Sequence, residues 1–81
     1  MNRIRAQIRL DTQKKILEFT SQMLNVVGHY TVENYNGSLR VDALSLLGLM
    51  YASGDFGDEM YLVNETDNGY FPNFVDNYRV S

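Results

Sequence analysis

The side chains that could do chemistry in this sequence are few, and they do not form a catalytic set. The chain has no cysteine and one histidine, His29, so neither a thiolate metal site nor a nucleophile–base pair is expected. The spacing of Asp55, Asp58 and Glu59 does not match a calcium-binding EF-hand loop. No glycine-rich phosphate loop and no pair of zinc-binding histidines is present. We therefore expect a protein that is not an enzyme and that needs no metal or cofactor.

Ser45 is the hydroxyl-bearing residue with the most informative setting. It lies within residues 43–52, Ala-Leu-Ser-Leu-Leu-Gly-Leu-Met-Tyr-Ala, where leucine, methionine and alanine favour a helix. A serine at the start of a helix caps unpaired backbone N–H groups. The same position would accept a phosphate well, because the positive end of the helix dipole lies there. A plain N-cap and a regulatory phosphorylation site are both compatible with this pattern.

The apolar residues that follow Ser45 cannot all face a core. If Leu49 packs inside, neighbouring positions on a short helix point elsewhere. Leu46, Leu47 and Met50 are then left at least partly exposed, which on a small domain is typical of a protein-binding surface. The alternative is that Leu46 or Leu47 packs against the last helix.

Four strands are expected around this segment. Residues 3–10 alternate strictly between apolar and polar, which predicts a strand with arginines on its solvent face. Residues 29–35 alternate until the phase breaks after Val32, where the strand either bulges or ends early. Asn36-Gly37 predicts a hairpin turn into a return strand over 38–42. Residues 59–64 form the fourth alternating segment.

Two further helices are expected. The first is capped at Asp11, runs to about Val26 and ends at Gly28 as a C-cap glycine. Its apolar stripe consists of Ile16, Phe19, Met23 and Val27. A short last helix begins near Pro72, and loops or turns are expected over 53–58 and 66–69.

The resulting order is β-α-β-β-α-β-α within one domain, residues 1–81. Short connections and one hairpin predict an α+β fold of two layers, with an antiparallel four-stranded sheet and the helices on one face. The apolar stripe of the first helix is expected to face the core, because periodic apolar residues normally face the interior.

The charge distribution narrows the class of partner. The net charge is −3 over 81 residues, and a small acidic domain is a poor general binder of nucleic acid. The basic residues gather in residues 1–15, where five face one acidic residue, so a local basic end is available to an acidic protein partner. No apolar segment is long enough to span a membrane and no secretory signal is recognisable. We expect a cytoplasmic protein.

Residues 35–50 resemble the histidine-containing phosphocarrier protein (HPr) family of the bacterial sugar phosphotransferase system. In that family an Asn-Gly hairpin leads into Val-x-x-x-Ser-x-x-Gly-x-Met, and this chain has Val41, Ser45, Gly48 and Met50 at that spacing. The resemblance implies the sheet order 1-4-2-3 with three helices on one side. It also implies that Ser45 is the regulatory phosphorylation serine. The surface that docks enzyme I, the HPr-type kinase and regulators would then fall on Leu46, Leu47 and Met50.

The family's phosphoacceptor site is degenerate in this chain. The acceptor histidine position falls on Thr12 or Gln13, and the following arginine position falls on Lys14 or Lys15. The proline of the family motif is missing. Neither Thr12 nor Gln13 can form a phosphoimidazole, and His29 lies at the far end of the helix.

Three functions follow as hypotheses. The first is an HPr-like binding or regulatory module without the carrier histidine, whose partner is enzyme I, an HPr-type kinase or a regulator. The second is a working phosphocarrier with a displaced acceptor, for which His29 is the sole histidine available. The third is a structural domain of the same fold that self-associates weakly, since a fold alone does not determine function.

Overall fold

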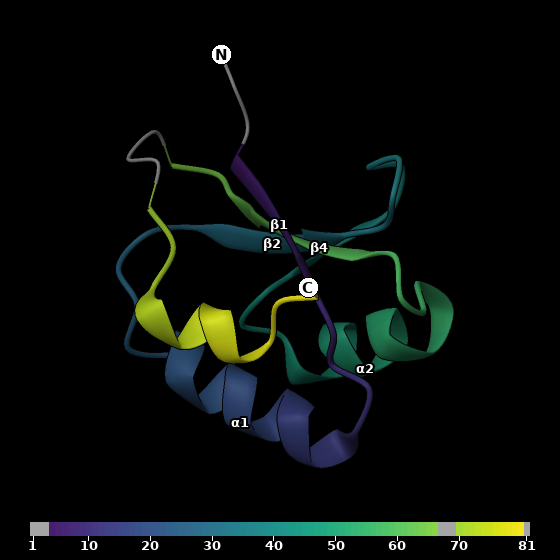
Figure 1. Cartoon of the computed structure of the whole chain (residues 1–81), viewed down its shortest axis with the longest axis horizontal. Helices are drawn as coiled ribbons and strands as arrows, with labels where there is room; N and C mark the ends of the chain where they lie inside the picture. Colours follow the sequence, from purple (N-terminus) through teal and green to yellow (C-terminus); the bar gives the residue numbers. More distant parts are fainter. Residues whose placement is uncertain (1–3, 67–69, 81) are drawn as a thin grey trace.

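The computed structural model describes residues 4–66 and 70–80 and has two layers, with the helices on one face of a sheet (Figure 1). The fold is α+β, and its element order is the predicted one. The last helix is a 3₁₀ helix rather than an α-helix. The elements are β1 (Ile4–Ile8), α1 (Gln13–Met23), β2 (Tyr30–Glu33), β3 (Arg40–Asp42), α2 (Leu46–Asp55), β4 (Met60–Asn64) and η1 (Asn73–Asn77).

The sheet is antiparallel and has the order β1-β4-β2-β3, which agrees with the expected 1-4-2-3. Its register carries one apolar row across all four strands, because Ala6 pairs with Leu62, Leu62 with Val32, and Val32 with Val41. Successive side chains alternate between faces, so this row faces the helices and the intervening residues form the outer face.

The central hairpin is shorter than its sequence pattern suggests. β2 ends at Glu33, so the phase break marks an early end rather than a bulge, and β3 begins at Arg40 instead of residue 38. The predicted turn is present: Gly37 has a φ of 75°, a conformation that favours glycine. The side-chain oxygen of Asn36 accepts a hydrogen bond from the Ser38 N–H at 3.0 Å.

The first helix differs from its prediction at both ends. Its N-cap is Thr12 rather than Asp11, because the Thr12 hydroxyl accepts a hydrogen bond from Lys15 N at 3.1 Å. The helix ends at Met23, well before Gly28, which therefore does not cap it. Val27 is correspondingly 88% exposed instead of continuing the apolar stripe.

The second helix is longer than predicted. It runs to Asp55, so the first part of the expected loop 53–58 is helical. The hydroxyl of Ser53 donates to the carbonyl of Leu10 at 2.6 Å, which ties this end of α2 to the segment before α1. The expected turn at 66–69 falls mostly on residues 67–69, outside the described residues.

The C-terminal segment packs against one end of the core and lies along the β1 edge of the sheet. Phe19 of α1 makes edge contacts with Phe74 and Tyr78, at ring-centroid distances of 5.9 and 5.3 Å. Beyond η1 the chain lies antiparallel to β1, with Arg79 bridged to Ile8. The largest fully buried apolar side chains are Phe19, Ile8, Leu10, Leu49, Met60, Leu62, Val32, Val63 and Val75.

Candidate functional site

Ser45 caps α2, as the sequence predicts. Its Oγ accepts a hydrogen bond from Gly48 N at 3.0 Å, and its carbonyl accepts from Leu49 N at 2.9 Å. The turn before it is held by Asp42, whose Oδ1 accepts from Leu44 N at 2.8 Å. Ser45 is half-buried, and its hydroxyl takes part in the first turn of α2.

Gly48 is what allows this helix start to lie close to β3. A Cβ built at Gly48 would lie 3.0 Å from the Ser45 Oγ and 3.0 Å from the Val41 Cβ. Both distances are shorter than ordinary contacts between carbon and its neighbours. The glycine in the middle of the apolar segment therefore serves close packing of α2 against β3.

Three apolar side chains of α2 face solvent, as their spacing predicts. Leu49 is fully buried, whereas Leu46, Leu47 and Met50 are 37%, 79% and 41% exposed. We call these three residues the α2 surface. Leu44 and Tyr51, just outside it in sequence, are 48% and 49% exposed, so exposed apolar residues run from the turn before α2 into its middle.

The residues of the degenerate phosphoacceptor segment gather at the start of α1. Thr12 is the cap, and Gln13, Lys14 and Lys15 follow in the first turn. Lys15 Nζ lies 3.1 Å from the carboxylate of Asp11, and the hydrogen bond from Lys15 lowers the pKa of that carboxyl below its ordinary value. His29 is exposed and directly precedes β2, so the fold places it after the C-terminal end of α1, away from this first turn.

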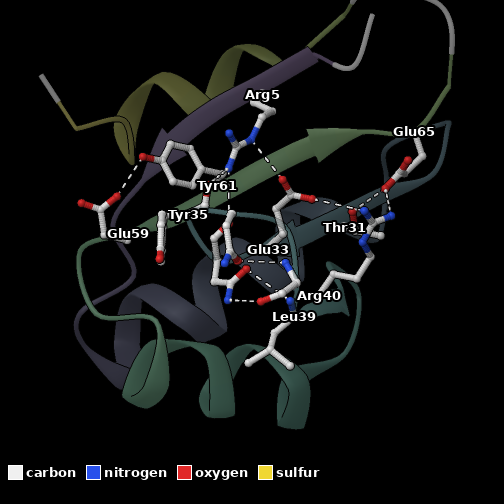
Figure 2. Close-up of polar contacts among 12 residues, drawn as sticks. Arg5, Thr31, Glu33, Tyr35, Leu39, Arg40, Glu59, Tyr61 and Glu65 are labelled. Carbon is white, nitrogen blue, oxygen red and sulfur yellow. Dashed lines mark hydrogen bonds and ion pairs between the residues drawn. The ribbon is translucent and has the colours of Figure 1, made fainter. Parts of the chain in front are cut away.

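The outer face of the sheet holds a polar network that sequence reasoning missed (Figure 2). The side chain of Glu33 is 2% exposed, and its carboxylate lies 3.0 Å from Arg5 Nε and 3.5 Å from an Nη of Arg40. Arg40 also lies 3.3 Å from Glu65 Oε2, which accepts a hydrogen bond from the Thr31 hydroxyl at 2.7 Å. The network ties β1, β2 and β3 to the end of β4.

Arg5 is the residue that links this network to the hairpin turn. Its guanidinium carbon lies 4.0 Å from the centre of the Tyr61 ring, and its Nη2 donates to the carbonyls of Asn34 and Tyr35. Tyr61 in turn donates to Glu59 at 2.9 Å, and this hydrogen bond raises the pKa of the phenol. The sequence predicted that arginines lie on the solvent face of this strand, but it did not predict that Arg5 contacts Glu33, Tyr61 and the turn carbonyls.

Three kinds of feature are not found among the residues that the structure describes. Within 4–66 and 70–80, no group of three or more histidine, cysteine or acidic side chains is placed to hold a metal ion. None of the helices in these ranges is long and apolar enough to cross a membrane. In the same part of the chain, no buried side-chain nitrogen or oxygen lacks a hydrogen-bond partner.

Comparisons with known proteins give no relative for this chain: no family model, no curated protein and no solved structure matches it.

Proposed function

We propose that this chain is an HPr-like protein-binding module that docks through the α2 surface and lacks the carrier step. The observation that carries the proposal is the exposure of Leu46, Leu47 and Met50 beside the half-buried Ser45 cap. Contiguous exposed apolar side chains on a small domain mark interaction sites. The order of the elements, the sheet order and the hairpin leading to α2 support the HPr-like assignment.

The proposed partners are enzyme I, an HPr-type kinase or a regulator of the phosphotransferase system. Phosphate on Ser45 would act as a switch, because it adds roughly −2 charge at pH 7. The charge would lie at the positive end of α2, where the dipole favours it, and beside the three apolar side chains, where it alters the choice of partner.

Incubation with an HPr-type serine kinase and ATP, read by intact mass, tests the switch. We expect one added phosphate on the wild type and none on Ser45→Ala. Equal labelling of the two proteins, or no labelling of either, would contradict the assignment of Ser45.

The carrier alternative requires a histidine that accepts phosphate from enzyme I. A transfer site needs a positioned acceptor and a cationic clamp, and the first turn of α1 presents Thr12 and Gln13 instead. We therefore expect no acid-labile phosphate after incubation with enzyme I and phosphoenolpyruvate. Labile phosphate on His29 would replace the binding-module proposal with the carrier.

Self-association is the competing use of the same surface. The exposed side chains of Leu46, Leu47 and Met50 can contact a second copy of the chain instead of a different protein. Sedimentation velocity over a range of protein concentrations separates the two. A monomer supports a surface reserved for a different partner, and a concentration-dependent dimer abolished by Leu47→Asp supports the oligomerising domain.

A further inference from the structure

A cavity of about 320 Å³ opens where the C-terminal segment meets the end of β1 and the start of α1. Its lining residues are Arg9, Lys15, Asn77, Tyr78, Arg79 and Val80. The cavity exists because the last residues run beside β1, where Tyr78 O accepts from Arg9 N at 2.8 Å and Val80 N donates to Gln7 O at 3.0 Å. Segments far apart in sequence therefore line one recess.

The lining of this cavity is cationic. Half of its six lining residues are Arg9, Lys15 and Arg79, and none is acidic. Each of these cations has a carboxylate neighbour, but those carboxylates do not line the cavity. Arg9 pairs with Asp58 at 3.3 Å, Lys15 with Asp11 at 3.1 Å and Arg79 with Asp76 at 2.8 Å.

These ion pairs leave the cations able to bind a ligand. The side chains of Asp58, Asp11 and Asp76 are 75%, 50% and 72% exposed, and pairs in solvent hold their partners weakly. Within the described residues, the pairs engage one nitrogen of each cation: Nη2 of Arg9, Nζ of Lys15 and Nε of Arg79. An arginine carries five N–H donors and a lysine three, so further donors remain for an anion.

We propose that this cavity binds a small organic polyanion carrying carboxylate or phosphate groups. Arginine forks match the geometry of both groups, and the volume falls at the lower end of the range for small-molecule sites. The net charge of −3 over the whole chain disfavours long polyanions such as nucleic acid. The inference does not rest on the proposed docking function, since the cavity shares no residue with the α2 surface.

Titration of the 81-residue chain with citrate and, separately, with inorganic phosphate tests the proposal by NMR at low ionic strength. We expect saturable amide shifts centred on Arg9, Lys15, Tyr78 and Arg79, weakened by added NaCl. Tighter binding of citrate would indicate a polycarboxylate site, and tighter binding of phosphate a phosphoryl site. Amide shifts that stay linear, without saturation, up to about 10 mM of both anions would mean that the cavity has no useful affinity for either. That result would overturn the proposal.

Lys15 and Lys14 provide a matched pair of variants. Both are cations in the first turn of α1, but Lys15 lines the cavity and Lys14 does not. We expect Lys15→Ala to weaken binding about tenfold, in line with the loss of a charge-assisted hydrogen bond, and Lys14→Ala to leave it within about twofold. Equal loss in both would show general charge attraction and overturn the site.

Arg79→Gln provides an independent check from the C-terminal side of the cavity. The change removes the charge while keeping a shorter, uncharged polar side chain at an exposed position. We expect about tenfold weaker binding with an unchanged melting temperature. Unchanged affinity in a folded Arg79→Gln protein would contradict the assignment, and Arg9→Gln gives the same test should the first variant be unstable.

Discussion

The guanidinium of Arg5 lies 3.0 Å from the carboxylate of Glu33, although the two residues belong to strands that are not neighbours. β4 runs between them and contributes Tyr61, over whose ring the guanidinium lies. The pair therefore spans the middle of the sheet on the face opposite the helices. It holds β1, β4 and β2 in one register and, through the carbonyls of Asn34 and Tyr35, the hairpin turn as well.

Removing the Arg5 side chain is predicted to lower the free energy of unfolding more than removing the charge of Glu33. Arg5→Met leaves the buried carboxylate with fewer partners and removes one donor from each of the carbonyls of Asn34 and Tyr35. We expect the free energy of unfolding to fall by about 2–4 kcal/mol. Glu33→Gln removes the buried charge itself, and both arginines are partly exposed to solvent. We therefore expect the free energy of unfolding to fall by about 1 kcal/mol. Urea unfolding shows which of the two variants is less stable. Equal losses of stability would contradict this account of the network.

The two glycines of α2 are predicted to respond to alanine in opposite directions. Gly48→Ala places a methyl group 3.0 Å from Val41 Cβ and Ser45 Oγ, and we expect about 1–2 kcal/mol of destabilisation. Gly54→Ala meets open space and should stabilise by up to about 1 kcal/mol through helix propensity. Thermal unfolding of both variants measures this difference, and stabilisation by Gly48→Ala would refute the close approach of α2 to β3.

Substitution of Ser45 separates its capping role from its proposed regulatory role. Ser45→Ala loses the hydrogen bond to Gly48 N, and we expect a loss of about 1 kcal/mol. Ser45→Asp keeps a cap and places a negative charge at the positive end of the helix, so stability should stay near that of the wild type. Denaturant unfolding provides the comparison. A Ser45→Asp protein as unstable as Ser45→Ala would argue against an anion being tolerated at this position.

Stability is predicted to fall at high pH because of the tyrosines. Burial raises the pKa of Tyr30 and Tyr78 above the ordinary value of 10.0. Their stabilising contribution is present below that value and is lost as pH rises through the higher pKa of the folded state. Phenolate absorbance should therefore show these two groups ionising late, together with unfolding. Their titration near pH 10 in a still-folded protein would contradict the buried placement.

Local patterns predicted most of the elements because their causes are local. Alternation identified the strands, Asn36-Gly37 specified the turn, and Ser45 marked the start of α2. The ends of helices were less predictable: Thr12 caps α1 where Asp11 was also suited, and α2 continues to Asp55, where the Ser53 hydroxyl donates to the carbonyl of the distant Leu10.

The features missed by the sequence depend on contacts between distant segments. Glu33 is buried because β2 lies between β4 and β3 and because arginines from β1 and β3 reach its carboxylate. The cavity requires the last residues to lie along β1, where Arg79 is bridged to Ile8. Neither pairing leaves a periodic signal in its own segment, so the polar network and the cationic cavity became visible once the sheet order was known.

Docking through the α2 surface is tested most directly by binding of enzyme I and an HPr-type kinase to two matched variants. Leu47→Asp and Val27→Asp each place a carboxylate at an apolar position, 79% and 88% exposed in the wild type, so both should fold normally. Calorimetric titration should show the wild type and Val27→Asp binding at least one of the two partners equally. Leu47→Asp should bind it at least about tenfold more weakly. Equal affinity of Leu47→Asp and Val27→Asp, or no binding of either partner by the wild type, would contradict the proposed function.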